Sequence, residues 1–123
     1  MKAAKMKPTV HIVEDDEANR NSLRDVLEIY GFPVAVFASG EEFFARMPSD
    51  PESCVIIDFN LPGANGLEVL RRLRTDRGAI PAVVVSGRAT SDMRAQAARL
   101  GASFFEKPID IDQLVTMIEP AAH

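Results

Sequence analysis

The sequence predicts an α/β protein with a doubly wound parallel sheet of five strands and five helices. Two observations support this fold class. Short apolar runs alternate five times with longer amphipathic segments, which is the pattern of repeated strand–helix units. Three of the runs are continuously apolar, as is typical of strands covered by helices on both faces. The length of 123 residues suits one domain, so we expect residues 1–123 to form a single domain.

The first unit joins an apolar strand at residues 10–13 to a helix with one apolar face. The residues of this face follow the spacing i, i+3, i+4, i+7 of a buried helical stripe, and they are Leu23, Val26, Leu27 and Tyr30. We expect Asp16 to cap the start of the helix, because its carboxylate can accept hydrogen bonds from free backbone N–H groups. Gly31 is placed to end the helix.

The second unit has a weaker strand at residues 34–37, which suits a position near the edge of the sheet. Ser39 and Glu42 have the spacing of a capping box and predict the start of the next helix. The apolar side chains expected to face the core are Phe43, Phe44 and Met47. Pro48 predicts the end of this helix, because proline lacks the N–H that would continue it.

The third unit begins with the apolar run at residues 54–57, which ends at Asp58. A turn rich in proline, glycine and asparagine follows, and Asn65 with Glu68 repeats the capping-box spacing. The buried stripe of the third helix is predicted to consist of Leu67, Val69, Leu70 and Leu73.

The fourth unit has an apolar run at residues 82–85 that stops at Ser86 and Gly87. The helix expected after it, over residues 91–100, is rich in alanine and has few large apolar side chains. This composition predicts a helix that is less firmly packed on the sheet than the others.

The fifth unit has a short strand at residues 103–105, closed by Lys107 and Pro108. Asp110 with Gln113 is expected to cap the last helix. The apolar face of that helix contains Leu114, Val115 and Ile118.

The arrangement of these units in the sheet can also be predicted. The first, third and fourth runs are the most apolar and are therefore expected to be buried on both faces. Right-handed crossovers leave few ways to connect parallel strands. For five strands the common arrangement is the flavodoxin-like order 2-1-3-4-5, which we expect here.

Composition limits the classes of function. The formal net charge is −4, the pI is about 5.1, and no stripe of lysine and arginine is evident, so direct binding of nucleic acid is not expected. Cys54 is the single cysteine and lies in an apolar run, which predicts a buried, unreactive thiol and suits a reducing compartment. The sequence shows no signal-peptide pattern and no apolar segment of membrane-spanning length, so we expect a cytoplasmic protein without membrane contact.

Acidic residues follow two strands that the predicted order makes neighbours. Glu14, Asp15 and Asp16 follow the first strand, and Asp58 follows the third. Ligands of open parallel sheets bind beyond the carboxyl ends of the strands, at the point where the strand order reverses. Carboxylates that converge there repel one another unless a cation is present. Mg²⁺ suits such a site, because it prefers a few carboxylates together with water and phosphate oxygens.

The fourth and fifth strands bring two further groups to the same edge. Ser86 offers a hydroxyl group and Lys107 a positive charge. A nucleophilic aspartate, a metal ion, a hydroxyl and an ammonium group together suit phosphoryl transfer to a carboxylate. We therefore expect Asp58, Ser86 and Lys107 to carry the chemistry.

These motifs, in this order and spacing, resemble the receiver domain of two-component response regulators. The resemblance covers about residues 9–118. The segments that carry it are Val13–Asp16, Asp58 with Leu61, Pro62 and Gly66 after it, Val85–Gly87, and Lys107–Pro108. Each segment alone is a weak signal, but four strand ends that each carry the required group are specific together.

The resemblance implies a role for each matching position. Asp58 corresponds to the phosphoacceptor, and Glu14 with Asp15 to the acidic pair that holds Mg²⁺, which Asp58 and the backbone carbonyl of Asn60 would also bind. Lys107 would pair with the phosphoryl group.

Ser86 and Phe104 correspond to the switch positions of the family, and Pro108 to a residue after a cis peptide bond. Phe104 lacks the phenol of the more common tyrosine, and Ser86 stands where many members have threonine. Asn60 and Arg88 occupy positions that tune dephosphorylation in the family. We hypothesise that Arg88, with its bulk and charge, restricts access of water to the phosphoryl group.

The resemblance also implies partners. The phosphoryl donor would be a histidine kinase or a phosphotransfer protein, and the output would act through a downstream effector protein or a domain outside this chain. A dimer through the fourth helix, fifth strand and fifth helix is left open, as is whether the domain stands alone or comes from a larger regulator or hybrid kinase. The expected activity is limited to the domain's own phosphotransfer and autodephosphorylation, so it is not expected to be an enzyme acting on small molecules.

Three other functional classes are alternatives to this interpretation. A phosphatase of the haloacid dehalogenase type has a second aspartate two residues after its nucleophile, where this chain has Asn60. A dinucleotide-binding protein has a glycine-rich turn after the first strand, where this chain has the acidic residues 14–16. A receiver-like adaptor that is not phosphorylated stays open, although the complete set of site residues argues against it.

Overall fold

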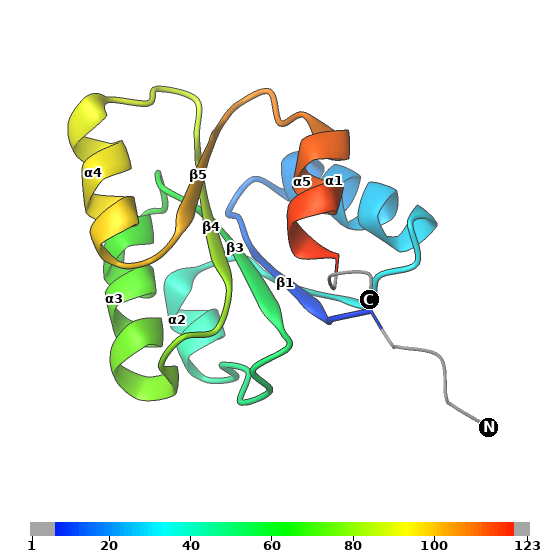
Figure 1. Cartoon of the computed structure of the whole chain (residues 1–123), viewed down its shortest axis with the longest axis horizontal. Helices are drawn as coiled ribbons and strands as arrows, with labels where there is room; N and C mark the ends of the chain where they lie inside the picture. Colours follow the sequence, from blue (N-terminus) through cyan, green and yellow to red (C-terminus); the bar gives the residue numbers. More distant parts are fainter. Residues whose placement is uncertain (1–6, 120–123) are drawn as a thin grey trace.

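The computed structural model describes residues 7–119, which form one parallel sheet with helices on both faces (Figure 1). The strands are β1 (Val10–Val13), β2 (Val34–Phe37), β3 (Cys54–Asp58), β4 (Ala82–Ser86) and β5 (Ser103–Glu106). The helices are α1 (Glu17–Ile29), α2 (Gly40–Phe44), α3 (Gly66–Arg77), α4 (Ser91–Arg99) and α5 (Ile111–Ile118). The strands pair in parallel in the order β2-β1-β3-β4-β5, which confirms the predicted flavodoxin-like topology.

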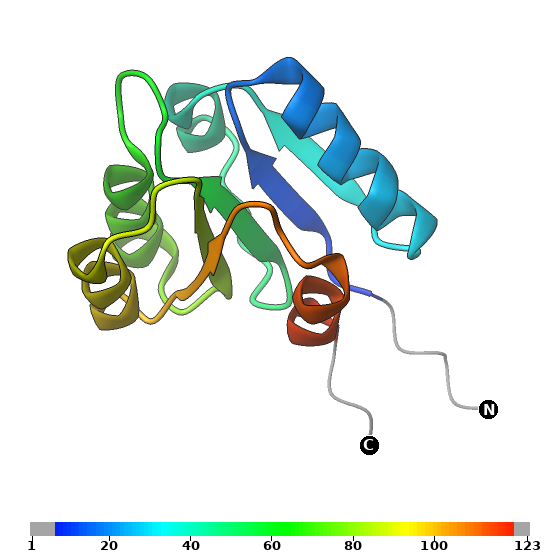
Figure 2. The ribbon, with the colours of Figure 1, turned by 90° about the horizontal axis from the view of Figure 1, so that it is seen from above.

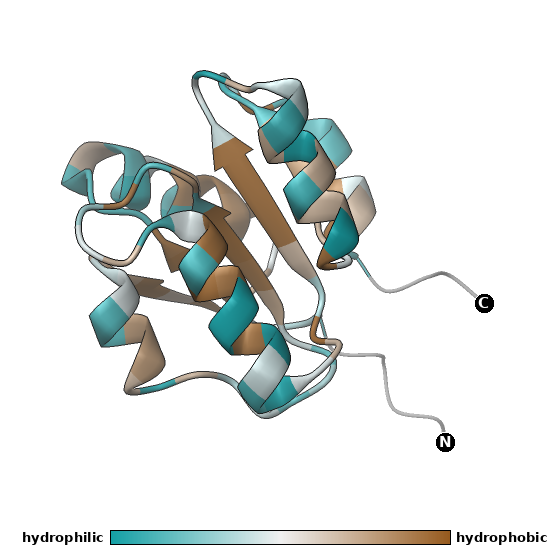
Figure 3. Cartoon of the chain, turned by 90° about the vertical axis from the view of Figure 1, so that its left-hand side faces the viewer, coloured by the Kyte–Doolittle hydropathy of each residue, from teal (hydrophilic) through white to brown (hydrophobic). Residues whose placement is uncertain are grey.

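Two apolar layers hold the helices to the sheet. Helices α1 and α5 cover one face, where Leu27 and Leu114 are buried (Figure 2). Helices α2, α3 and α4 cover the other face, where Phe43, Leu70 and Ala97 are buried. Every residue of β3 and β4 is buried, and the apolar strands lie between layers of amphipathic helices (Figure 3). The apolar runs that form β3 and β4 are therefore buried on both faces, as predicted.

The helix starts are capped at the predicted residues. In each case a side-chain oxygen accepts a hydrogen bond from the backbone N–H three residues later. The pairs are Asp16 with Asn19, Ser39 with Glu42, Asn65 with Glu68, and Asp110 with Gln113. Thr90 caps α4 in the same way, which the sequence analysis did not identify.

The end of α1 differs from the prediction at Tyr30, which is 38% exposed and does not face the core. The helix ends at Ile29, and Gly31 has a φ of 93°, a conformation that favours glycine. The N–H groups of Gly31 and Phe32 bond back to the carbonyls of Glu28 and Leu27. The chain reversal places Phe32, which is 2% exposed, where the helical spacing had placed Tyr30.

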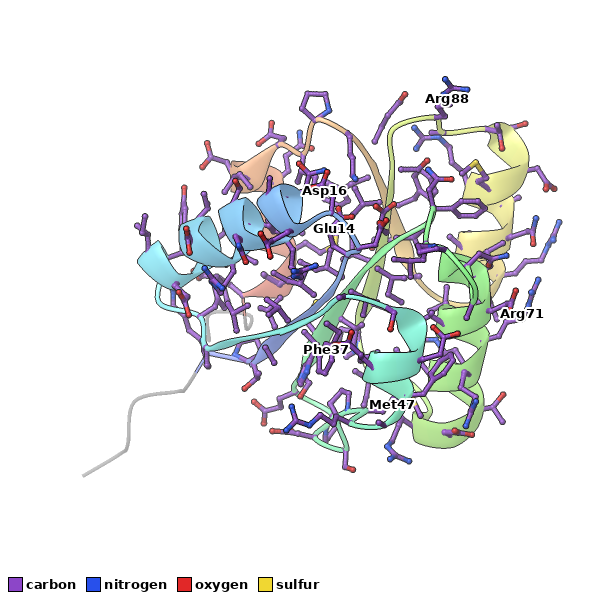
Figure 4. The ribbon with its side chains drawn as sticks, turned by 180° about the vertical axis from the view of Figure 1, so that it is seen from behind. Glu14, Asp16, Phe37, Met47, Arg71 and Arg88 are labelled. Atoms are coloured by element: carbon purple, nitrogen blue, oxygen red, sulfur yellow. The ribbon has the colours of Figure 1, made fainter. Side chains whose placement is uncertain are left out.

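Helix α2 is also shorter than predicted, because it ends at Phe44 and not at Pro48. The backbone N–H of Arg46 bonds to the carbonyl of Phe43 at 2.9 Å, which tightens the last turn. Met47 is nevertheless buried, and it lies beside Phe37 of β2 (Figure 4). At the end of α2, the core is therefore filled by Met47 from the segment after the helix, and not by a further helical turn.

His11 lies in β1 with its ring stacked on Phe37, and the two ring centroids are 6.1 Å apart. Burial lowers the pKa of this imidazole, as expected for a histidine packed at the edge of the core. Within residues 7–119, no helix has both the length and the hydropathy needed to cross a membrane.

Candidate functional site

The candidate site lies at the carboxyl edge of the sheet, where β1 pairs with β2 on one side and β3 on the other. This is the position where the strand order reverses and where parallel sheets bind ligands. Glu14 and Asp16 occupy the short connection between β1 and α1 (Figure 4). Asp58 is the last residue of β3, and Lys107 follows β5.

Asp58 is held at the end of a fully buried strand. It is 7% exposed, and its two carboxylate oxygens have different partners. Oδ1 accepts a hydrogen bond from the backbone N–H of Asn60 at 3.0 Å. Oδ2 accepts one from Nζ of Lys107 at 3.2 Å. These bonds fix the orientation of a carboxylate that has little access to solvent.

Lys107 links the two buried carboxylates of the site. Its Nζ lies 3.2 Å from Oδ2 of Asp58 and 3.2 Å from Oε1 of Glu14. Its backbone N–H bonds to the carbonyl of Ser86, which ties the segment after β5 to the end of β4. Burial alone would lower the pKa of Lys107, but the charges and hydrogen bonds of Asp58 and Glu14 raise it overall. The ammonium group is therefore charged at neutral pH. The Lys107–Pro108 peptide bond is cis, as the resemblance implied.

Glu14 is the most perturbed carboxyl group of the site. It is 6% exposed, and its Oε2 accepts a hydrogen bond from the backbone N–H of Asp16 at 3.2 Å. Burial, together with the nearby Asp58, raises the pKa of Glu14 to about 7, although Asp16 and Lys107 act in the opposite direction. The site therefore contains more negative charge than Lys107 alone can balance.

The acidic residues fit a divalent cation. Glu14, Asp15 and Asp58 each place one carboxylate oxygen within 4.8 Å of the others. Two of these residues are buried and Asp15 is exposed, so the cluster opens to solvent on one side. A small hard cation with oxygen ligands and retained water would relieve the repulsion that raises the pKa of Glu14. The residues present thus suit Mg²⁺.

The other predicted residues surround this cluster without closing it. Ser86 is fully buried at the end of β4, and its Oγ accepts a hydrogen bond from the backbone N–H of Arg88 at 3.1 Å. Asn60 is exposed and contacts Asp58 through its own N–H. Phe104 is half-buried in β5, against the core on the α4 side of the sheet. The structure therefore brings Glu14, Asp15, Asp58 and Lys107 together, while Ser86 and Phe104 occupy the two neighbouring strands. The side chain of Arg88 is exposed and points away from Glu14 (Figure 4).

Gly66 has a structural role that the sequence analysis did not explain. Its N–H bonds to the carbonyl of Phe59 at 3.0 Å, which brings the start of α3 against the end of β3. A Cβ atom at this position would lie 2.6 Å from the carbonyl oxygen of Asp58 and 2.6 Å from Cα of Phe59. Only glycine permits this approach, and the approach fixes the loop that follows Asp58. The capping pair Asn65 and Glu68 indicates where α3 begins but not how close it lies.

Arg20 was also missed. Its guanidinium group contacts the backbone carbonyls of Glu14 and Asp15, and only 14% of its side chain is exposed. The spacing of four residues from the capping residue Asp16 places it over the start of α1, and this spacing is the signal by which the sequence could have identified it.

The fold and the site together define an α/β protein with an acidic, cation-type site at the switch point of a flavodoxin-like sheet. Comparison with known proteins agrees. Residues 10–119 match the family model described as response regulator receiver domain. FixJ of Bradyrhizobium diazoefficiens, a transcriptional regulatory protein, is 34% identical over 116 residues, covering 94% of this chain and 57% of FixJ. DctD of Rhizobium meliloti, a C4-dicarboxylate transport transcriptional regulatory protein, is 35% identical and covers 88% of this chain and 24% of DctD.

Solved structures give the same result. The structure described as FixJ-N is 34% identical with a TM-score of 0.80, covering 93% of this chain and 91% of that one. Response regulator StyR is 31% identical with a TM-score of 0.82, covering 91% of this chain and 57% of that one. The chain thus belongs to the receiver domain family of two-component response regulators. The acidic site is consistent with the phosphoryl-accepting aspartate and the Mg²⁺ site of that family. The chain spans little more than half the length of FixJ and about a quarter of that of DctD.

Proposed function

We propose that this receiver domain is switched by phosphorylation of Asp58 in a Mg²⁺-dependent reaction, and that residues 1–123 act as a single receiver domain. The observation that carries the proposal is the geometry around Asp58. A buried carboxylate, two further carboxylates within 4.8 Å and an ammonium group at 3.2 Å are concentrated at one strand end. Few structural roles require so much buried charge at one place.

In the proposed reaction, a carboxylate oxygen of Asp58 attacks the phosphorus atom of a phosphohistidine. The P–N bond breaks as the new P–O bond forms. The donor ring, already protonated on its other nitrogen, takes the electrons of the P–N bond and leaves as neutral imidazole. Lys107 lies 3.2 Å from the Asp58 carboxylate, close enough to bind an oxygen of the transferred group. Mg²⁺, held by Glu14, Asp15, Asp58 and the backbone carbonyl of Asn60, would neutralise charge on the phosphoryl oxygens.

The conformational response would begin at Ser86, whose hydroxyl lies at the end of the strand next to β3. We propose that Ser86 binds a phosphoryl oxygen and that Phe104, one strand further, changes its position with it. This sequence of events would convert a local charge into a change of the surface formed by α4, β5 and α5. The activity would be limited to phosphotransfer to Asp58 and its later hydrolysis.

The groove beside the site supports a protein as phosphoryl donor. It has a volume of about 510 Å³ and lies between α1 and the segment that joins β5 to α5. Glu14 and Lys107 belong to both groove and site, and the apolar residues along the groove include Leu23, Val26 and Ile109. A histidine kinase or phosphotransfer protein that binds here would present its phosphohistidine directly to Asp58. We further propose that the output passes to a downstream effector, either in another protein or in a domain outside this chain. We also propose a cytoplasmic location.

The test is the intact mass of the protein after incubation with phosphoramidate, with and without Mg²⁺. We expect wild type to gain one phosphoryl group only with Mg²⁺, and Asp58→Asn to gain none. Asp76→Asn is a matched control, because Asp76 is an exposed aspartate on α3 that pairs with Arg72. A folded wild type that gains no mass from phosphoramidate or from a phosphorylated histidine kinase would contradict the proposal.

A further inference from the structure

Arg20 connects helix α1 to the backbone of the acidic pair Glu14 and Asp15. One nitrogen of its guanidinium group, Nη1, donates to the backbone carbonyl of Glu14 at 3.0 Å and to that of Asp15 at 3.4 Å. Its Nη2 lies 4.0 Å from a carboxylate oxygen of Glu17. Arg20 therefore bridges the second turn of α1 and the two residues that carry the acidic pair.

Helix geometry directs this side chain to the site. Long side chains on a helix point back toward its N-terminus, over the preceding turn. Arg20 lies four residues after Asp16, the capping residue, and its N–H bonds to the Asp16 carbonyl. Its guanidinium group consequently reaches past the start of α1 to the loop formed by Glu14 and Asp15.

The helix dipole disfavours a cation at this position, although the acidic residues nearby favour one. The N-terminus of a helix carries a partial positive charge, which favours acidic side chains and disfavours basic ones. Only 14% of the Arg20 side chain is exposed, so water compensates little of this cost. The carbonyls of Glu14 and Asp15 and the carboxylate of Glu17 offset it. This arrangement uses a mostly buried charge to fix two peptide groups.

The peptide groups concerned determine where the acidic side chains lie. Glu14 also accepts a hydrogen bond from the Asp16 N–H, so its carboxylate and its backbone are both tied to the start of α1. Asp15 is exposed, and no hydrogen bond to its carboxylate is seen among residues 7–119. The orientation of the Asp15 side chain therefore depends on its backbone, which Arg20 contacts.

We propose that Arg20 is a positioning residue for the Mg²⁺ site, holding the backbone of Glu14 and Asp15 so that their carboxylates face Asp58. The inference rests on the proposed function, because it assumes that this acidic cluster binds Mg²⁺. Groups that orient metal ligands without touching the metal typically change metal affinity by about 10–100-fold when they are removed. Arg20 would act in this way through the backbone rather than through the ligand side chains.

The experiment is a calorimetric titration of the full chain with Mg²⁺, carried out on wild type, Arg20→Ala, Arg20→Lys and Arg24→Ala. Arg24 is the matched control, because it lies one turn further along α1 and, among residues 7–119, pairs only with Asp25 and Glu28. Both alanine variants lose one positive charge. We expect Arg20→Ala to raise the Kd for Mg²⁺ by about tenfold, the low end for such groups. Arg24→Ala should leave the Kd unchanged.

Arg20→Lys separates position from charge. It keeps the positive charge but has a single ammonium group in place of the planar guanidinium, so we expect a Kd between those of wild type and Arg20→Ala. Thermal unfolding in EDTA shows whether each variant is folded before Mg²⁺ is added. If Arg24→Ala raises the Kd as much as Arg20→Ala does, the effect does not depend on the contacts of Arg20 and the positioning role is wrong.

The result for wild type distinguishes the two proposals. A folded wild type that binds no Mg²⁺ contradicts the proposed function itself. A wild type that binds Mg²⁺, with Arg20→Ala binding equally well or more tightly, contradicts only the role of Arg20, since removal of a positive charge would then leave the site unchanged or more attractive to the cation.

Discussion

Charged groups gather at two neighbouring places in this molecule, and the two places differ in burial and in the balance of charge. At the carboxyl edge, Lys107 contacts the carboxylates of Glu14 and Asp58, and both carboxylate side chains are less than 10% exposed. Between α4 and β5, Arg94 pairs with Glu106 at 3.3 Å, and the two side chains are 48% and 55% exposed. The first group is buried with excess negative charge, whereas the second is a matched pair in water.

The difference supports the proposed division between a reactive site and a surface that changes. Buried, unbalanced charge is costly and is retained where a ligand or reaction uses it. Arg94 also lies over the ring of Phe104, with its Cζ atom 4.9 Å from the ring centroid. Exposed ion pairs contribute little to stability, so the pair between Arg94 and Glu106 does little to hold Phe104 in place. A buried charged site next to an aromatic side chain that only an exposed ion pair covers on its outer side is consistent with the proposed switch.

The largest expected effect comes from disturbing the backbone that holds Asp58. Gly66→Ala places a Cβ 2.6 Å from backbone atoms of Asp58 and Phe59, neither of which can move without shifting β3. We expect a loss of about 1–3 kcal/mol in the free energy of unfolding, as for other overpacked sites. Gly87→Ala is the control, since an added Cβ there meets nothing within 4 Å. Urea denaturation of both variants measures the difference, and equal stabilities would show that α3 can move away from β3.

A change of pH in the absence of Mg²⁺ is expected to have an intermediate effect on the free energy of unfolding. Folding raises the pKa of Glu14 from 4.5 to about 7, so the folded state holds a proton that the unfolded state has lost. Stability should therefore fall by roughly 1–2 kcal/mol as the pH rises from about 5 to about 8. Lys107 does not contribute in this window, because its raised pKa keeps it charged in both states. His11 acts in the opposite direction, because burial lowers its pKa from 6.5 and the unfolded state then binds a proton that the folded state does not. Thermal or urea unfolding across this range measures the slope.

Two controls test the assignment of this pH dependence. Glu14→Gln removes this titrating group and should abolish the fall in stability, leaving only the opposite contribution of His11. Saturating Mg²⁺ should reverse it, because the cation binds the ionised carboxylates and stabilises the folded state more strongly at higher pH. A fall in stability that persists in Glu14→Gln would mean that another group is responsible.

The smallest effect on the free energy of unfolding is expected from the exposed ion pair between Arg94 and Glu106. Arg94→Ala removes both the bond to Glu106 and the contact with Phe104. We expect it to lower the free energy of unfolding by no more than about 1 kcal/mol. Arg99→Ala, an exposed arginine on the same helix, provides the comparison in urea denaturation. A loss as large as that of Gly66→Ala would contradict the view that the exposed pair does little to hold Phe104 in place.

Much of the fold could be predicted because its signals are local. The apolar runs at 10–13, 54–57 and 82–85 fall in the three central strands, and the expected capping residues start the helices. Errors occurred where a helix ends. Tyr30 continues the helical spacing and was expected in the core. The turn at Gly31 instead leaves Tyr30 exposed and buries Phe32. Helix ends depend on which side chain best fills the core, and a single segment does not contain that information.

The sequence by itself determined the strand–helix alternation, the helix caps and the groups at each strand end, because these depend on residue type and short-range spacing. It also identified Glu14, Asp15, Asp58 and Lys107 as candidates, since parallel strands bring their carboxyl ends to one edge. Only the tertiary structure decided how closely these groups approach and how each is supported. The 3.2 Å contacts of Lys107, the backbone bonds of Arg20 and the close approach of Gly66 to β3 join segments distant in the chain or on separate elements. Such contacts follow from how helices seat on the sheet, which residue spacing does not specify.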